Sequence, residues 1–181
     1  MIRFFLTFCS LLPLKFNHLF GSFIGCLLYL FNSETKRVSR QNLEICFPNL
    51  SEESLKILLK KVLAETGKGL TESGLIWNQK FKENAKLVRK INGEHYLNKS
   101  KKTILLVPHM GCWEITGRIL AERRKVTFMY RPLRSNKQND YLFAKRNQGN
   151  LTMASADKSG ILKIHRALNN GNLVGILPDQ D

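Results

Sequence analysis

The sequence predicts an α/β fold in which a helical N-terminal region precedes a mostly parallel β-sheet flanked by helices. From residue 91 onward, short apolar runs typical of buried strands alternate with helical patterns, as in βαβ units. The expected strands are residues 103–107, 126–130 and 173–177, and the expected helices are residues 114–124, 138–146 and 159–168. Adding the segments upstream, we expect three regions: residues 1–31, 32–90 and 91–181.

The first of these regions, residues 1–31, is expected to associate with a membrane. Its full charges are Arg3 and Lys15, and two apolar runs, residues 2–14 and 19–31, lie on either side of a polar break. Each run is shorter than the roughly 20 residues that a straight span needs. The segment therefore suits a kinked span or two helices lying in the membrane interface. An ordinary buried pair of helices is the alternative.

Residues 32–90 carry helix signals. Ser51 is expected to be an N-cap, because two glutamates follow it where the helix dipole favours negative charge. Leucines at helical spacing then form one apolar stripe. Further along, Gly67, Gly69 and Gly74 are expected to break or loosen the helix.

The composition points to a single globular chain with an anionic partner. With 181 residues, of which 43% are hydrophobic, the chain can bury a core. Its net charge of +15 favours nucleic acid, an anionic membrane, phosphorylated lipid or an acidic protein. The four cysteines show no CxxC pair, so we expect reduced structural thiols rather than a zinc site.

Polar side chains follow each of the three expected strands. His109 comes after the first strand and Glu114 five positions later, Arg131 follows the second strand, and Asp179 and Asp181 follow the third. Ligands bind outside the carboxyl ends of strands in open α/β sheets. The pattern therefore predicts an active site with His109 as general base and Glu114 as the acid that orients it. Asp179 is either a loop acid or a partner of Arg131 or His109.

Other candidate chemistry is not supported by the sequence. Neither a glycine-rich phosphate loop nor a nucleophilic serine elbow is present. His18, His95 and His165 lack a catalytic context, and we treat Trp113 as packing. A base and an acid without a protein nucleophile indicate direct attack by a substrate hydroxyl.

Five motifs stand out in combination: residues 40–48, residues 92–97, the histidine–acid pair of His109 and Glu114, the block 130–132 with the later Arg146, and the block 177–181. Together these motifs resemble those of the late acyltransferases of lipid A biosynthesis, within the lysophospholipid acyltransferase-like superfamily. The resemblance runs from about residue 10 to the end, and Cys112 stands where that family usually has asparagine.

The resemblance implies an acyltransferase that uses acyl-carrier protein as donor and a lipid A precursor as acceptor. It also implies that Arg131, Asp179 and Arg146 bind substrate and that neither metal nor cofactor takes part. The expected location is the bacterial inner membrane, with an anionic surface as partner and the catalytic part facing the cytoplasm. Because members of the family run on further, we expect a C-terminally truncated chain with an incomplete sheet.

Two alternatives remain open at this point. The acceptor could be a lysophospholipid or another glycolipid, or the chain could be an inactive membrane-bound remnant of the family. Nucleic acid is not an expected partner, because the sequence offers no stacking aromatic platform and no recognisable binding module.

Overall fold

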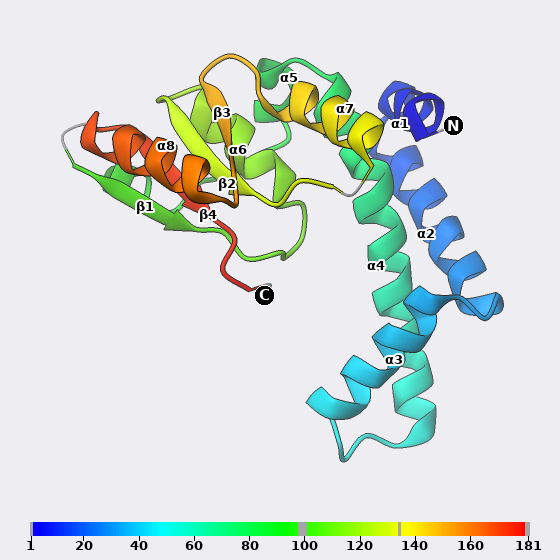
Figure 1. Ribbon diagram of the computed structural model, residues 1–181. Coiled ribbons are helices and arrows are strands. Elements are labelled where there is room, and N and C mark those ends of the chain that lie inside the picture. The colour runs from blue at the N-terminus through cyan, green and yellow to red at the C-terminus, as the bar shows by residue number, and fades with distance from the viewer. Residues whose placement is uncertain (1, 98–100, 134, 180–181) are drawn as a thin grey trace. The chain divides into compact units, whose positions relative to one another are not determined.

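The computed structural model describes residues 2–97, 101–133 and 135–179 (Figure 1). The chain forms two compact units that divide between Asn78 and Gln79, and each is described by itself. This division differs from the three expected regions, whose boundaries lay after residues 31 and 90.

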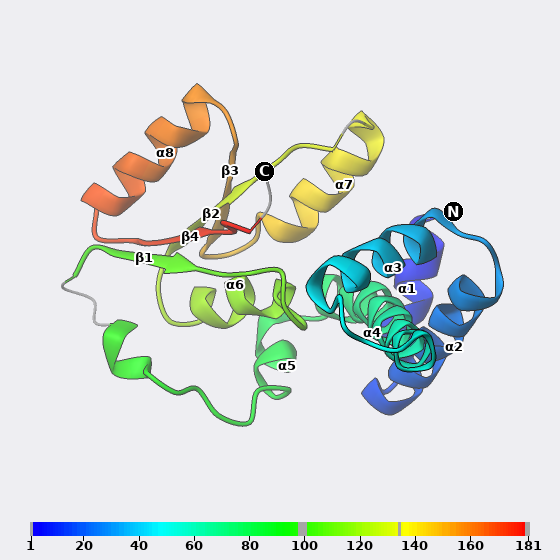
Figure 2. The same ribbon diagram turned by 90° about the horizontal axis from the view of Figure 1, so that it is seen from below.

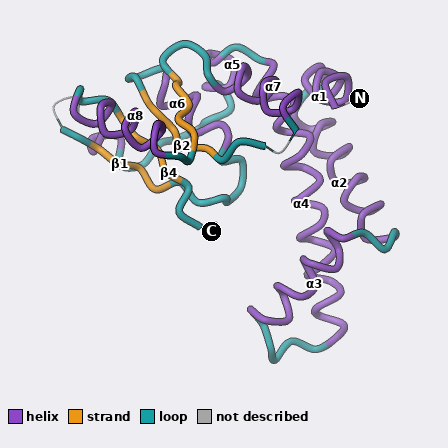
Figure 3. Tube along the Cα trace, in the orientation of Figure 1, coloured by secondary structure: helices purple, strands orange, loops and turns teal. Residues whose placement is uncertain are grey.

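The N-terminal unit consists of helices joined by short loops (Figure 3). Apolar α1 and α2 are separated by a break at Pro13, and the much longer α4 packs along them. Ser51 caps α4 as expected, since its hydroxyl accepts a hydrogen bond from the Ser54 amide at 3.2 Å. The helices of this unit are α1 (Ile2–Leu11), α2 (Leu14–Leu30), α3 (Glu34–Cys46) and α4 (Glu52–Asn78).

The glycines of α4 do not break it, so that expectation was wrong. α4 continues through Gly67 and Gly74. Both glycines face neighbouring helices at very short range, and this packing outweighs their poor helix propensity. A Cβ on Gly67 would lie 2.0 Å from the Gly21 carbonyl oxygen, and one on Gly74 would lie 2.6 Å from the Leu6 carbonyl oxygen. Both glycines therefore permit close helix packing.

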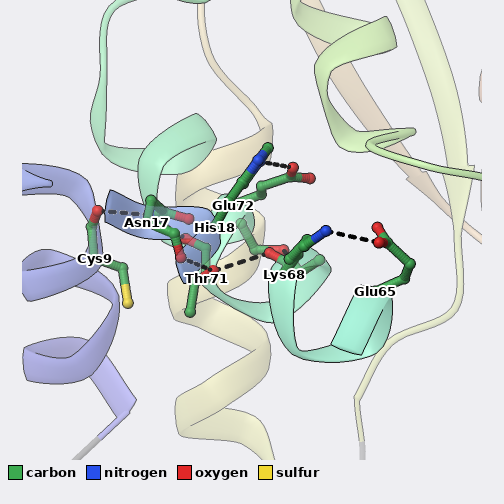
Figure 4. A network of polar contacts seen from close by, with 9 residues as sticks. Cys9, Asn17, His18, Glu65, Lys68, Thr71 and Glu72 are labelled. Atoms are coloured by element: carbon green, nitrogen blue, oxygen red, sulfur yellow. Dashed lines mark hydrogen bonds and ion pairs between the residues drawn. The ribbon is translucent and has the colours of Figure 1, made fainter. Parts of the chain in front are cut away.

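Buried polar groups fix α4 against the break between α1 and α2 (Figure 4). The side-chain Nδ2 of Asn17 donates to the backbone carbonyl of Cys9 at 2.9 Å and to that of Thr71 at 3.1 Å, and the Thr71 hydroxyl donates to the backbone carbonyl of Asn17 at 3.1 Å. His18 Nε2 lies 2.5 Å from a Glu72 carboxylate oxygen. These contacts set the position of α2 along α4, which close glycine packing alone would specify less well.

The outer surface of α1 and α2 is strongly apolar. Phe4 is 83% exposed and Leu11 is 77% exposed. Within the described residues, no single helix has both the length and the apolar composition to cross a membrane. α2 and α3 meet those criteria as a pair, with a bend of 84° between them.

The C-terminal unit is built on a parallel four-stranded sheet in the order β1-β4-β2-β3. α8 covers one face and α6 covers the other (Figure 2). The strands are β1 (Thr103–Leu106), β2 (Val126–Tyr130), β3 (Leu151–Ser155) and β4 (Leu173–Ile176). The helices are α5 (Phe81–Ala85), the 3-10 turn η1 (Glu94–Leu97), α6 (Glu114–Ala121), α7 (Asn136–Arg146) and α8 (Lys158–Asn169).

The α/β class and the parallel sheet were predicted correctly, and the sequence missed one strand. β3 pairs in parallel with β2 at the edge of the sheet. At the centre, β4 lies between β1 and β2, where the Phe128 ring occupies the space that a side chain on Gly175 would fill. The core of this unit consists of Val107, Leu120, Ala121, Val126, Phe128, Leu151, Met153 and Leu173.

Candidate active site

A pocket of about 350 Å³ lies at the carboxyl edge of the sheet. Residues that follow β1, β2 and β3 line it, together with side chains from α6 and α7. Its apolar wall includes Phe128, Leu151, Met153, Ile176 and Leu177, and its polar lining includes His109, Glu114, Arg131 and Arg146. The volume falls in the range of small-molecule sites, and four of the predicted site residues meet there.

His109 is held by Asp179, the fifth predicted site residue. The ring nitrogen Nδ1 lies 2.9 Å from Asp179 Oδ1, and the His109 backbone amide donates to Oδ2 at 2.7 Å. These two contacts, the side-chain one first, hold the pKa of the Asp179 carboxyl below its usual value. An ionised Asp179 favours the tautomer with a proton on Nδ1. Asp181, the other acid expected here, lies outside the described residues.

Glu114 makes an ion pair with Arg146. Two guanidinium nitrogens of Arg146 donate to its two carboxylate oxygens, with Nε at 3.2 Å from Oε2. The side chains are only 11% and 18% exposed, so water screens the pair weakly. In the described part of the chain, the carboxylate hydrogen-bonded to the His109 ring is that of Asp179, and the expected orienting role of Glu114 stays a prediction.

Trp113 packs in the core, as expected, and also touches the site on two sides. Its ring meets the His109 ring edge-on, with centroids 4.9 Å apart, and the Arg146 guanidinium lies 5.4 Å from its centroid. The sequence analysis assigned it to packing alone. Its position directly before α6, between His109 and Glu114, is the sequence signal for this second role.

The loop from β1 to α6 turns at Gly111, which has a positive φ of 57°. This conformation favours glycine and lets His109 and Glu114 both line the pocket from opposite ends of a short loop. Arg131 directly follows β2 and is exposed at the pocket. Across the described residues, no three His, Cys, Asp or Glu side chains gather as a metal site requires.

Comparison with known proteins shows which family the chain belongs to. The family model described as bacterial lipid A biosynthesis acyltransferase matches residues 1–181, the whole chain. The chain belongs to this family. The expected resemblance is thereby confirmed.

Curated relatives in the lipid A acyltransferase family agree with this assignment. The lipid A biosynthesis lauroyltransferase of Escherichia coli strain K12 is 28% identical over 175 residues, which are 94% of this chain and 56% of that protein. A lipid A biosynthesis acyltransferase of Haemophilus influenzae is 27% identical over 150 residues, 80% of this chain and 46% of that protein. The lipid A biosynthesis palmitoleoyltransferase of Escherichia coli strain K12 is 25% identical, over 89% of this chain and 53% of that protein. The chain thus spans about half the length of these relatives.

Proposed function

We propose that this protein transfers a fatty acyl chain from the thioester of acyl-carrier protein to a hydroxyl of a lipid A precursor. The observation that carries the proposal is the His109–Asp179 pair beside a largely apolar pocket, in a chain of the lipid A acyltransferase family. The names of the relatives support the class of acceptor. The acyl-carrier protein donor comes from the family resemblance, and the base–acid pair without a protein nucleophile supports direct attack by an acceptor hydroxyl.

His109 acts as the general base. Because Asp179 occupies Nδ1, the other ring nitrogen, Nε2, takes the proton from the acceptor hydroxyl. Asp179 keeps the ring in the required tautomer and stabilises the imidazolium that forms. Glu114 lines the same pocket with its carboxylate held by Arg146, and it is proposed to orient His109 from the α6 side.

The acyl chain moves in one addition and one elimination. The acceptor oxygen forms a bond to the thioester carbonyl carbon as its proton passes to Nε2. The tetrahedral intermediate then collapses, the C–S bond breaks, and the leaving thiolate takes the proton back from His109. Arg131 stabilises the oxyanion or a phosphate of the acceptor, and Arg146, a more buried residue of the same lining, is a second contact for anionic substrate.

The apolar wall of the pocket receives the acyl chain. Phe128, Leu151 and Met153 are buried core residues that also face this space. Burying each methylene group against such a wall contributes about 0.8 kcal/mol. This binding free energy holds the thioester carbonyl near His109.

The apolar helices α1 and α2 are proposed to hold the protein on the inner membrane, where it meets its lipid substrate from the cytoplasmic side. Large apolar side chains are exposed along both helices, which suits insertion into the interface between headgroups and acyl chains. The basic net charge of +15 favours an anionic membrane surface. These side chains are Ile2, Phe4, Phe8, Leu11, Leu14, Phe16, Leu19, Phe23 and Leu30.

A vesicle assay tests this attachment. Phe4→Ser combined with Leu11→Ser should reduce flotation with vesicles that contain anionic phospholipid, whereas Leu70→Ser, at an exposed leucine of α4, should not. Equal flotation of the double variant, Leu70→Ser and the unchanged chain would refute the role of α1.

The decisive test of the function is His109→Ala, compared with the unchanged chain in membranes. We expect acyl transfer to a lipid A precursor to fall by about 10²- to 10⁴-fold. A lysophospholipid and an unrelated glycolipid are offered as acceptors in parallel. If the protein acylates either of these acceptors faster than the lipid A precursor, that acceptor replaces the proposed one. If the protein binds membranes but transfers no acyl chain to any acceptor, it is an inactive member of the family.

A further inference from the structure

Arg118 is a fully buried arginine next to the pocket but outside its lining. Its side chain is on α6, one turn after Glu114, and is 1% exposed. Burial lowers the pKa of its guanidinium to about 10, an effect that the nearby Glu114 carboxylate partly opposes. The group therefore stays charged near pH 7 in an environment that disfavours charge.

The contacts of Arg118 join three segments of the C-terminal unit. Nη1 donates to the carbonyl of Gln79 at 3.0 Å and to the side-chain oxygen of Asn84 at 3.3 Å. Nη2 donates to the carbonyl of Lys145 at 3.0 Å, and the Phe81 ring lies 4.5 Å from the guanidinium carbon. α6 is thereby tied both to the α5 segment and to the last turn of α7.

Both partners of the Glu114–Arg146 ion pair lie next to these anchor points. Glu114 is four residues before Arg118 on the same helix, and Arg146 directly follows Lys145, whose carbonyl Arg118 holds. The two backbones that carry the ion pair are thus fixed relative to each other by one side chain. A planar guanidinium can make these divergent contacts, whereas an ammonium or an apolar side chain of similar volume cannot.

We propose that Arg118 is a positioning residue that sets the geometry of the Glu114–Arg146 wall, and through it the depth and charge of the catalytic pocket. The inference rests on the proposed function for its kinetic readout. Burying the Arg118 charge costs desolvation free energy that an apolar residue would avoid. The placement of Glu114 and Arg146 explains why an arginine is present at this position despite that cost.

The kinetic test compares Arg118→Lys and Arg118→Met with Arg124→Lys. Arg124 is a matched control, because it is 8% exposed and also donates to backbone carbonyls, those of Leu97 and Gly171, outside the pocket. We expect kcat to fall by about 100-fold in Arg118→Met, as for an active-site displacement of about 1 Å. Arg118→Lys should recover part of this loss, and Arg124→Lys should lower Tm while leaving kcat unchanged.

A second readout does not depend on activity. In a Trp77→Phe background, the fluorescence of Trp113 reports on the Arg146 guanidinium beside its ring. Acrylamide quenching of Trp113 should change in both Arg118 variants and stay constant in Arg124→Lys. If the unchanged chain shows no acyl transfer, the proposed function fails and this quenching alone decides the role of Arg118. Unchanged kcat and quenching in the folded Arg118 variants, or equal effects in Arg124→Lys, would overturn the proposal.

Discussion

Asp179 contacts His109 at two points, through the ring nitrogen and through the backbone amide. The register of the sheet explains this contact. Leu106 of β1 pairs with Ile176 of β4, and His109 and Asp179 each come three positions after their member of that pair. Because the two neighbouring parallel strands end at the same level of the sheet, the base and its acid lie next to each other.

Asp179→Asn tests whether the charge of Asp179, rather than its size and hydrogen bonding, is needed for catalysis. The amide can keep a hydrogen bond to His109 but cannot stabilise an imidazolium, so we expect kcat to fall by about 100-fold or more. Asp140→Asn, at an exposed acid on α7, serves as the control and should leave kcat unchanged. Steady-state kinetics with saturating acceptor measure the difference. If Asp179→Asn has the same kcat as wild type, the proposal that Asp179 stabilises the His109 imidazolium is wrong.

The sequence was sufficient to predict that the candidate site residues lie close together. The apolar runs identified β1, β2 and β4, and the rule that parallel strands share a carboxyl edge brought His109, Arg131 and Asp179 to one place. The partner of His109 was harder to predict, because Glu114 is five positions away whereas Asp179 is 70 positions away. Only the order of the strands decides between a near and a distant acid, and a single sequence does not encode that order in any local pattern.

The missed features share a physical cause. β3 is a five-residue strand, LTMAS, whose hydroxyl side chains and edge position hide the apolar pattern of a core strand. The role of Gly67 in α4 was read from its local helix propensity, which is poor, whereas its actual environment is the backbone of α2. In both cases a tertiary contact outweighs the local preference.

The Glu114–Arg146 pair should show strong energetic coupling. Either Glu114→Gln or Arg146→Met leaves the other charge weakly hydrated, so each should lower the free energy of unfolding by roughly 2–4 kcal/mol. The double variant removes both charges and should be less destabilised than the sum of the two. Urea unfolding of the four proteins measures the coupling. The exposed pair of Glu34 and Arg37 is the control, with no coupling expected, and strictly additive effects at Glu114 and Arg146 would contradict the prediction.

Asp157 should make the stability of the C-terminal unit depend on acid pH. It caps α8, accepting hydrogen bonds from the hydroxyls of Ser155 and Ser159 and from the Gly160 amide, which lower its pKa to about 2 from 3.8. A lowered folded-state pKa means that its stabilisation is complete above about pH 4 and is lost as the pH falls through about 2. Asp157→Asn keeps a capping oxygen without the charge. The Tm difference between wild type and this variant should therefore shrink between pH 4 and pH 2. A difference that stays constant over this range would show that the charge contributes nothing.

Gly67 and Gly69 offer a matched pair of substitutions two residues apart in α4. A Cβ on Gly67 would lie 2.0 Å from the Gly21 carbonyl oxygen and 2.8 Å from the Gly25 amide nitrogen, both rigid backbone atoms of α2. Gly67→Ala must therefore move α2 away from α4, and we expect it to cost at least about 2 kcal/mol of unfolding free energy.

The substitution Gly69→Ala should have the opposite sign. Gly69 is exposed, and a Cβ there meets no atom within 4 Å, so alanine only restricts the unfolded chain and improves helix propensity. We expect a gain of about 0.5–1 kcal/mol. Thermal unfolding of the two variants beside wild type makes the comparison, and because the exchange of glycine for alanine is the same, helix propensity cancels between them. If both variants shifted Tm in the same direction, the close approach of α2 and α4 at Gly67 would not be the contact that holds these helices together.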